Sequence, residues 1–379
     1  MKICVITSAH PVFDKRIFNR EIRSLKKFGH EISYLAPTKT QYQIVDGVKI
    51  WGIPVRSKFA RFLNWLVVFR LAIQERYDCF HIQDPDLLLV AILIKIFTKK
   101  PVVYDVHENY GDRVLRKAKI PNIIKDSMGF IVNIIEYICV KVIKNVIVAH
   151  DFQVQRFKKI GCNTLLLENF AKLENFPQEK VRKNYSDKIV VFTGELIAIR
   201  GAEILAKVIS ALVSRRSDIQ FNIIDFIRNK KDRQEWEKLI HKYNIANKFK
   251  TIPMVAPDCM ADIVSMGVIG LIVEPHTGQL RKNPFIPTRL YEYFACGLAV
   301  ITREHEGFKD IIQKNGCGIV LSDNDMDNAS KFTENIIYLI DHPNIVAEMG
   351  QKGRQLFVSK YNWELQEPSF KEYYRKLFN

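Results

Sequence analysis

The sequence predicts an α/β protein made of two doubly wound domains. Short apolar runs alternate with amphipathic segments along the chain, which is typical of parallel sheets covered by helices on both faces. The alternation stops at residues 168–188, which are polar, contain a proline and show no strand pattern, and a second series then begins. A chain of 379 residues is also long for one core. We therefore place a domain boundary in 168–188.

The first half contains five predicted strands. Each is a short apolar run, and together they cover residues 2–7, 31–36, 79–82, 101–105 and 144–149. Between the first two strands, Asp14 can cap a helix that continues to Phe28 and ends at Gly29.

The second half repeats this alternation. Its predicted strands are 188–193, 219–225, 267–273, 298–302 and 317–321. Helices are expected over 201–215 and 232–243, and a third begins at Pro287 and Thr288. The final segment, "NWELQEPSFKEYYRKLF", predicts a helix beyond the second domain.

The positive charge is concentrated in the first half. Residues 1–172 carry 28 lysines and arginines against 15 acidic residues, within a net charge of +16. This indicates an acidic partner: nucleic acid, anionic lipid headgroups or a phosphorylated substrate. No zinc finger, RNP-type strand or basic tract supports nucleic acid. Residues 56–73 and 120–144 mix basic and large apolar side chains, as membrane-interface helices or buried helices do, and the charge asymmetry favours the membrane.

Cysteine usage and hydropathy predict a cytoplasmic location, peripheral on the inner face of the plasma membrane. The seven cysteines are scattered without a C-x-x-C pair, so we expect buried thiols in a reducing compartment. The first residues lack the apolar core of a signal peptide, and no run reaches the ~18 apolar residues that a bilayer span needs.

Histidines in the first half lie at or near predicted strand ends, where open parallel sheets bind ligands. Four share this placement: His10, His81, His107 and His150. Each alone could be an ordinary hydrogen-bonded loop histidine. His107 is the strongest candidate, because it follows a strand and is flanked by Asp105 and Glu108.

The D-x-D in "FHIQDPDLL" could hold a metal that bridges a diphosphate. A structural interpretation fits better, with Asp84 as N-cap, Pro85 in the first helical position and Asp86 in the first turn. We therefore expect no metal.

Two helix starts in the second half could bind an anion. In "FTGELIAIRGAEIL", Gly194 ends a strand and Arg200 precedes Gly201 at a helix start, which suits a diphosphate. In "IPTRLYEYFACG", Arg289 adds positive charge, and Glu292 one turn later could accept two hydrogen bonds from a ribose diol. A solvated helix glutamate is the alternative.

Taken together, these residues resemble the family-4 (group 1) retaining glycosyltransferases of the GT-B fold, in which two Rossmann-like domains face each other across a cleft. The similarity runs along nearly the whole chain and is closest to a bacterial branch used in surface-polysaccharide assembly. It is carried by the patterns "FDKRIFNREIRSLKKFGHEI", "HIQDPDLLLVAILIK", "VVYDVHENY", "IPTRLYEYFACGLAVIT" and "YNWELQ".

The resemblance implies an enzyme that transfers a sugar from a UDP- or GDP-sugar to a glycan or lipid-linked acceptor, without a metal. Residues 173–359 would bind the donor and residues 1–172 the acceptor, with 360–379 packing back on the first domain. The donor-binding residues implied are Gly194, Arg200, Arg289, Glu292, Thr288 and Asn169. His107 and Arg200 would act at the reaction centre, and the acceptor side would include His10, Asp14, His81 and Glu108.

The sequence departs from the family pattern at three places. Pro284 stands where the first of two paired glutamates is usual, Glu195 replaces a diphosphate-binding arginine, and "TSAHPVF" replaces a Gly-Gly loop. A sugar-nucleotide epimerase of the same architecture and a non-catalytic nucleotide- or lipid-binding subunit remain as alternatives. The basic apolar segments disfavour the epimerase, which needs no lipid acceptor.

Overall fold

The structure is a computed structural model that describes residues 1–57, 60–107, 122–197, 201–225, 227, 229–274, 286–304, 306–322 and 329–378. The chain forms two compact units. Unit 1 consists of Met1–Asn169 and Gln366–Asn379, and unit 2 of Phe170–Leu365. The final helix therefore belongs to unit 1, and the chain passes from unit 1 to unit 2 after Asn169 and back to unit 1 at Gln366.

Unit 1 is built on an eight-stranded sheet with the order β3-β4-β2-β1-β5-β6-β7-β8. All neighbouring pairs are parallel except β3 and β4, which form a hairpin at one edge. The strands are β1 Lys2–Ile6, β2 Glu31–Pro37, β3 Tyr42–Val45, β4 Val48–Ile53, β5 Cys79–Ile82, β6 Val102–Val106, β7 Asn145–Val148 and β8 Asn163–Leu166.

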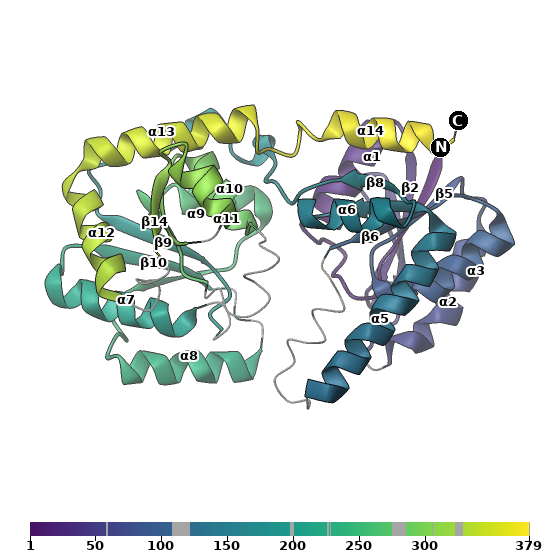
Figure 1. Ribbon diagram of the computed structural model, residues 1–379, viewed down its shortest axis with the longest axis horizontal. Helices are drawn as coiled ribbons and strands as arrows, with labels where there is room; N and C mark the ends of the chain where they lie inside the picture. Colours follow the sequence, from purple (N-terminus) through teal and green to yellow (C-terminus); the bar gives the residue numbers. More distant parts are fainter. Residues whose placement is uncertain are drawn as a thin grey trace. The chain divides into compact units, whose positions relative to one another are not determined.

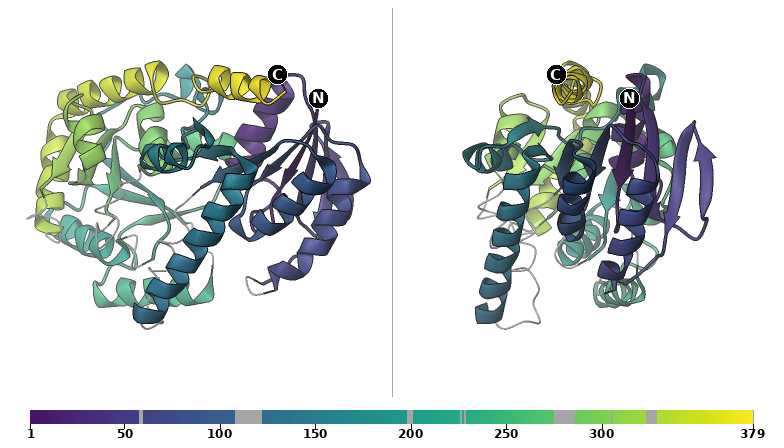
Figure 2. Two further views of the ribbon diagram at one scale, coloured as in Figure 1. Left: turned by 45° about the vertical axis from the view of Figure 1, so that its right-hand side comes forward. Right: turned by 90° about the vertical axis from the view of Figure 1, so that its right-hand side faces the viewer.

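Helices cover both faces of this sheet (Figures 1 and 2). On one face, α2 Trp65–Gln74, α3 Leu88–Thr98, α5 Asn122–Ile143 and α6 Asp151–Lys159 enclose an apolar core with Cys4, Ile6, Phe80 and Tyr104. On the other lie the π-helical turn η1 Ile17–Ile22, α1 Arg23–Lys27 and α14 Glu367–Lys376, with Phe28 against Phe370. Short turns η2 Arg61–Asn64 and η3 Pro85–Leu87 precede α2 and α3.

Unit 2 is built on a six-stranded parallel sheet with the order β11-β10-β9-β12-β13-β14. The strands are β9 Ile189–Gly194, β10 Gln220–Asp225, β11 Lys250–Pro253, β12 Ile269–Ile272, β13 Ala299–Arg303 and β14 Gly318–Leu321. The longer helices are α7 Ala202–Arg215, α8 Lys230–Lys242, α10 Thr288–Cys296, α12 Ala329–Asp341 and α13 Pro343–Ser359. The shorter elements are η4 Leu173–Asn175, η5 Gln178–Lys180, η7 Pro257–Cys259, α9 Met260–Val264, α11 Glu306–Phe308 and η9 Lys309–Gln313.

Two apolar cores sandwich the sheet of unit 2. Side chains of α7, α8 and α12 pack on one face, and those of α9, α10 and α13 pack on the other. Figure 1 shows α7 and α8 together on one side of the sheet and α10 and α13 on the other. The buried strands are largely apolar on both faces, as expected for a parallel sheet, although a few carry buried polar residues, such as Asn222 in β10 and Thr302 in β13.

The ten predicted strands are all present, with ends within two residues of those expected. Four further strands were not predicted: β3, β4, β8 and β11. These strands are short or lie at or next to a sheet edge, and three of them are largely exposed or half-buried, so their sequences lack a continuous apolar run.

Each sheet reverses its strand order at one place, the topological switch point. In unit 1 the chain leaves β1 towards β2 and later returns to the other side of β1 as β5. In unit 2 it leaves β9 towards β10 and returns to the other side of β9 as β12. In open α/β sheets, ligands bind beyond the carboxyl ends of the strands at such a point.

Candidate functional site

The switch point of unit 2 lies where β9 ends at Gly194 and β12 leads into Glu274. Two helices begin beside it. Gly201, in the left-handed region at φ 85°, precedes α7, and a Cβ there would overlap the carbonyl of Val273. Only glycine therefore lets the start of α7 approach the end of β12 so closely. The N-terminal N–H groups of a helix attract anions, so this edge is suited to phosphate.

Arg289 is a buried cation at this edge. It lies in the first turn of α10, is 8% exposed and forms an ion pair with Glu274, itself 6% exposed. Its guanidinium carbon lies 5.1 Å from the ring centroid of Phe192. A Cβ on Gly194 would overlap this guanidinium. The absence of a side chain at Gly194 thus makes the space that Arg289 occupies.

Tyr293 holds α10 against both strands of the switch point. Its hydroxyl accepts a hydrogen bond from the backbone N–H of Thr193 at 3.0 Å and donates one to the carbonyl of Leu271 at 3.2 Å. Its ring occupies the place where a Cβ of Gly270 would be. Burial raises the pKa of Tyr293 to about 12, so the hydroxyl keeps its proton. This residue fixes the axis of α10 and, with it, the position of Arg289.

Glu292 is buried, so the solvated alternative raised by the sequence is wrong. It is 6% exposed and lies one turn after Arg289 on α10. The helix begins at Thr288, and Pro287 in the N-cap position has no side-chain oxygen with which to cap the first N–H groups. Arg200, Pro284 and Glu108 lie outside the described residues. Glu195 is described and lies just beyond β9.

At the switch point of unit 1, the two aspartates of the D-x-D segment bind the residues directly after β1. The Asp84 carboxylate accepts hydrogen bonds from the Thr7 hydroxyl at 2.5 Å and the Ser8 N–H at 2.8 Å. The Ser8 hydroxyl donates to Asp86 at 2.7 Å. Pro85 is the first residue of η3, as predicted, but Asp84 does not cap that turn with its side chain. The carboxylates instead link the residues that follow β5 to those that follow β1.

Arg16 sits at the centre of a buried ionic network beside this point. It donates to both oxygens of Asp105 at 3.0 and 2.9 Å, and its Nε lies 2.8 Å from Glu21. Burial opposes ionisation of Asp105, but Arg16, His107 and a hydrogen bond with Glu21 together outweigh it and hold the pKa of Asp105 well below the usual range. Burial and the Asp105 charge raise the pKa of Glu21 well above its usual range. One carboxylate thus carries the charge that balances Arg16.

Asn169 joins the same network. Its side-chain oxygen accepts a hydrogen bond from Arg16 at 2.9 Å, and the carbonyl of Leu167 accepts another at 2.7 Å. The sequence placed Asn169 near the nucleotide, whereas the structure gives its side chain a partner within unit 1.

His81 is fully buried within β5, and this corrects its predicted place on the acceptor side. Its Nδ1 lies 2.8 Å from the hydroxyl of Tyr374 on α14. Burial lowers its pKa to about 4, so the ring is neutral near pH 7. His81, Glu21 and Asp105 have ligand atoms within 4.8 Å of one another, but Arg16 already contacts both carboxylates. The residue therefore positions its neighbours and does not line a surface.

The structure brings together three of the predicted residues: His10, Asp14 and His107. Nδ1 of His10 lies 3.2 Å from Asp14, and the His10 and His107 ring centroids are 5.0 Å apart. Nε2 of His107 lies 2.8 Å from Oε1 of Gln83, which assigns the proton to that nitrogen. Burial alone would lower the pKa of His10, but Asp14 and nearby carboxylates raise it. All three side chains are partly exposed, so a ligand can reach them.

The sequence did not predict the structural roles of four residues. They are Arg16, Asp84, whose carboxylate binds the residues after β1, Glu274 and Tyr293. Glu274 had a usable signal, because it directly follows the apolar run 267–273 at a carboxyl end. Arg16 had none, since Asp105 is 89 positions away.

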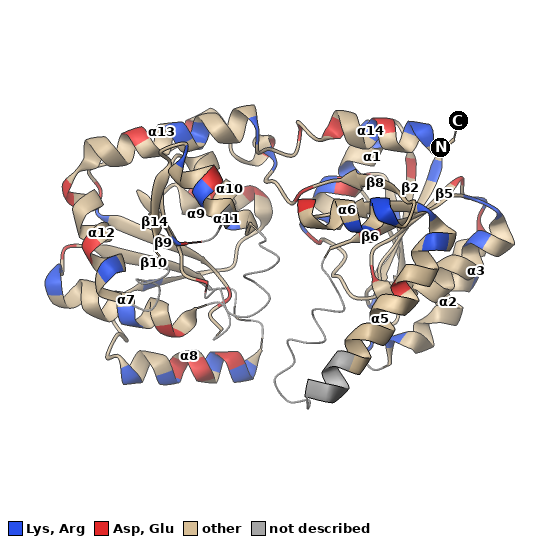
Figure 3. Ribbon diagram, viewed as in Figure 1, with Lys and Arg blue, Asp and Glu red and all other residues tan. Residues whose placement is uncertain are grey.

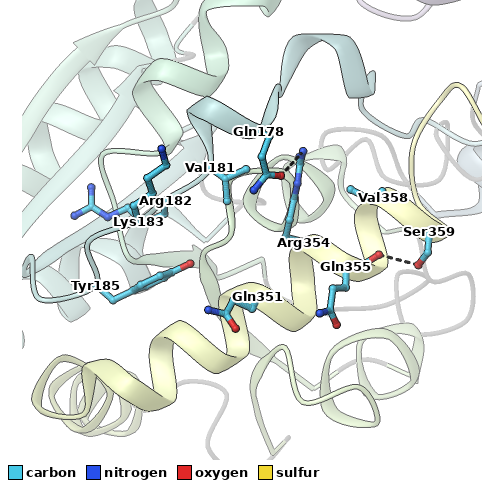
Figure 4. Close-up of a pocket in the computed structure, with 10 residues that line it drawn as sticks. All are labelled: Gln178, Val181, Arg182, Lys183, Tyr185, Gln351, Arg354, Gln355, Val358 and Ser359. Atoms are coloured by element: carbon cyan, nitrogen blue, oxygen red, sulfur yellow. Dashed lines mark hydrogen bonds between the residues drawn. The ribbon is translucent and has the colours of Figure 1, made fainter.

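Unit 2 also contains a separate hollow, drawn in Figure 4, between residues 178–185 and α13. Its volume is about 730 Å³. Arg354 extends towards Gln178 across it and donates to the carbonyl of Phe176 at 2.9 Å. None of the residues lining this hollow belongs to the switch point. Arg354 stabilises the structure by donating hydrogen bonds to the carbonyls of Phe176 and Ala295.

Sequence comparison finds a match to a family model within unit 2. Residues 174–356 match the family model described as "Glycosyl transferases group 1". A curated protein of Methanocaldococcus jannaschii, named as an uncharacterized glycosyltransferase, is 21% identical over 211 residues, which is 55% of this chain and 50% of that protein. The chain thus spans about half the length of the curated relative that it matches.

Solved structures resemble the whole chain. Sucrose-phosphate synthase from Thermosynechococcus elongatus matches with a TM-score of 0.76 at 16% identity, over 100% of this chain and 99% of that one. Anabaena HepE in complex with UDP-glucose matches at 0.70 and 12%, over 99% and 100%. The catalytic domain of Arabidopsis thaliana starch synthase IV, bound to ADP and acarbose, matches at 0.68 and 10%, over 100% and 99%. These likenesses establish the fold, two Rossmann-like α/β domains of the GT-B type.

Proposed function

We propose that this protein is a family-4 retaining glycosyltransferase that moves a sugar from a nucleoside-diphosphate sugar to a growing, lipid-linked surface glycan. The observation that carries the proposal is the switch point of unit 2. There the buried Arg289 occupies the space above Gly194, beside the starts of α7 and α10, in the unit that matches the group 1 model.

The donor would bind at this edge with its diphosphate against Arg289, Thr288 and the helix starts. Arg200 immediately precedes Gly201 in the sequence and would add a second cation. Glu292 would accept hydrogen bonds from the ribose diol. An incoming diphosphate would compete with Glu274 for Arg289, because both present anionic oxygens to one guanidinium. UDP or GDP is the expected nucleotide; among the similar structures, HepE holds UDP or UDP-glucose and the starch synthase IV domain holds ADP.

The chemistry would need charge stabilisation more than a nucleophile. As the nucleoside diphosphate departs, the sugar gains oxocarbenium character and the β-phosphate gains negative charge. Arg289, Arg200 and the helix starts would stabilise that charge, which makes a metal unnecessary in this scheme. The leaving phosphate would take the proton of the acceptor hydroxyl, so that the new bond forms on the face from which the leaving group departs.

The acceptor would bind to unit 1, near His10, Asp14 and His107, with Glu108 next to them in the sequence. His107 would approach the donor sugar. The surface-polysaccharide branch, meaning capsule, O-antigen or exopolysaccharide assembly, rests on the resemblance of the sequence patterns along nearly the whole chain. A cytoplasmic enzyme on the inner face of the plasma membrane would meet such an acceptor on its lipid carrier.

Nucleotide screening tests the donor assignment. Thermal unfolding of the full chain is measured with UDP, GDP, ADP, CMP and dTDP. One of them is expected to raise the unfolding temperature as its concentration increases. At a hundred times its Kd, the bound nucleotide should add about 2.7 kcal/mol to the free energy of unfolding. Failure of all five to stabilise the protein would contradict a donor site at this edge.

Product analysis separates transfer from the other possibilities. Incubation with the sugar nucleotide alone should leave the sugar unchanged, and an epimerised product would overturn the proposal in favour of an epimerase. Nucleotide binding without turnover across a full donor–acceptor panel would instead indicate a non-catalytic subunit.

A further inference from the structure

We propose that the exposed apolar sides of η2–α2, α3 and α5 form a surface that inserts into the interface of an anionic lipid bilayer. We call this surface the apolar face. The inference rests on the proposed function only in that a lipid-linked acceptor would be met there. It deepens that function by naming the residues and the lipid chemistry.

Helix α5 presents apolar side chains to solvent along most of its length. It has 22 residues, about 33 Å at 1.5 Å per residue. From residue 127 onward its solvent side is apolar apart from Ser127, Tyr137 and Lys141. The exposed large side chains are Met128 39%, Phe130 65%, Ile131 54%, Ile134 40%, Ile135 42%, Ile138 55% and Val142 40%. Solvent exposure of so many large apolar groups on one helix marks an interaction site.

Helices α3 and α2 continue this face. On α3 the exposed residues recur at helical spacing: Leu89, Leu93, Ile96 and Phe97. On η2 and α2 they are Phe62, Leu63, Leu66 and Ile73, with Leu66 76% exposed. Helix α3 contacts both α2 and α5, and the views of Figure 2 show the three helices side by side. The apolar surface is therefore continuous across three helices and not a set of isolated side chains.

The charge around the apolar face is basic. Among described residues 127–144, Glu136 is the one acidic residue, and it is 2% exposed and paired with Arg156. Helices α2 and α3 contain no acidic residue. Among the side chains that the structure describes, the exposed charges on and beside the three helices include Arg70, Lys99, Lys100, Lys141 and Lys144. Figure 3 shows the coloured part of these helices almost free of red. Basic residues beside exposed apolar side chains suit an anionic bilayer surface.

A basic hollow borders the apolar face between α5 and α6. Its volume is about 650 Å³, and it is lined in part by Asn133, Tyr137, Arg156 and Lys159. Tyr137 is also 45% exposed at the edge of the solvent side of α5. Nη1 of Arg156 is buried and has no hydrogen-bond partner among the described residues. A guanidinium nitrogen and an ammonium beside an apolar surface can bind the phosphate of an anionic lipid headgroup.

The face lies along the bilayer and does not cross it. None of the helices in the described part of the chain has the length and apolar character that a membrane span needs. The helices instead pack on the sheet through their other sides, through Cys139, Val140 and Ile143 for α5. A second copy of this chain is the competing occupant, but two copies of a basic surface would repel each other.

Vesicle co-sedimentation of the full chain tests this inference, with vesicles of phosphatidylcholine alone or with phosphatidylglycerol. We expect binding to the anionic vesicles, weakened by salt, and poor binding to the neutral ones. Ile96→Glu and Ile131→Glu should each weaken binding about ten-fold, because an apolar contact is lost and a repelled charge gained. The matched control is Ile44→Glu on β3, since Ile44 is 61% exposed against 60% for Ile96.

The hollow has its own pair of variants. Lys159→Gln should weaken binding to anionic vesicles, whereas Lys158→Gln, exposed on the same helix but not lining the hollow, should have a smaller effect. Thermal unfolding shows whether each variant is folded.

Three results would overturn the inference. The first is no vesicle binding by the wild-type protein, and the second is an equal loss of vesicle binding in Ile44→Glu and Ile96→Glu. The third is a protein that does not bind vesicles but self-associates, with Ile96→Glu abolishing the self-association. Nucleotide-dependent stabilisation of the same variants is measured in parallel. If it persists without vesicle binding, the membrane surface is wrong while the donor site stands. If it is absent while vesicles still bind, the proposed function fails and the apolar face remains.

Discussion

The switch points of the two units are built alike but filled differently. In unit 1, Arg16 is bound by Asp105 and Glu21, and Asp84 is bound by Thr7 and Ser8. In unit 2, Arg289 is paired with Glu274 in the space left by Gly194, next to two helix starts.

This difference separates a structural use of charge from a binding use. The unit 1 network satisfies its own buried charges with several fixed partners, which a fold requires of any buried ion. The unit 2 site combines Arg289 with glycines and helix starts, which makes it suited to exchange a carboxylate for a phosphate. Substitutions in the buried Arg16 network of unit 1 should therefore act mainly on stability, and those at the switch point of unit 2 mainly on nucleotide binding.

The largest expected effect is that of Arg16→Ala. Asp105 would lose both hydrogen bonds from its buried partner, so the free energy of unfolding should fall by about 3–5 kcal/mol. Urea unfolding followed by circular dichroism measures this. Arg216→Ala is the control, since Arg216 pairs with Asp218 and Asp341 at the surface and should matter little. Similar small losses in both variants would contradict the comparison.

Arg289→Ala should weaken nucleotide binding about 100-fold, the size of one or two charge-assisted hydrogen bonds. It also removes a partner of buried Glu274 and should lower stability. Adding Glu274→Gln should restore stability but not affinity, as measured by urea unfolding and calorimetric titration. Recovery of affinity in the double variant would show that Arg289 serves only to neutralise Glu274.

A smaller effect, about ten-fold in nucleotide affinity, is expected for Glu292→Ala, because two ribose hydrogen bonds would be lost. The wild-type protein should prefer the ribonucleotide to its 2′-deoxy form, and Glu292→Ala should lose that preference. Glu348→Ala, an exposed glutamate on α13, is the control. Unchanged affinity for the nucleotide in Glu292→Ala would defeat the ribose assignment.

The smallest effect concerns the pair His10 and Asp14. Asp14 raises the pKa of His10 above its usual 6.5, so Asp14→Asn should lower it in an NMR titration. The pKa of His10 is higher in the folded protein than in the unfolded chain. Protonated His10 paired with Asp14 therefore stabilises the fold fully below pH 6.5, and this stabilisation is lost as the pH rises through the raised pKa of His10. Asp14→Asn should thus cost stability at pH 6 and less at pH 8. An unchanged His10 titration would show that the hydrogen bond does not form in solution.

Much of the fold could be predicted because local sequence carries it. Apolar runs such as "KICVIT" and "KIVVFT" indicate buried parallel strands wherever they occur, and "IPTRLYEYFACG" contains its own helix start and glycine end. The C-cap Gly297 does adopt the left-handed region, at φ 74°. The edge hairpin β3–β4 was missed because Gln43 and Lys49 interrupt its apolar residues and most of its positions are half-buried or exposed.

The candidate sites also contain features that the local sequence predicts and features that it does not. The sequence by itself determined that Gly194, Arg289, Glu292, His10 and His107 lie near strand ends or helix starts, since a strand end is a local property. Only the tertiary structure decided which charges meet: Arg16 with Asp105, Glu274 with Arg289, and His81 with Tyr374. These partners lie 89, 15 and 293 positions apart in the chain, and their distance in the folded structure sets pairing, burial and pKa. No local pattern contains that distance.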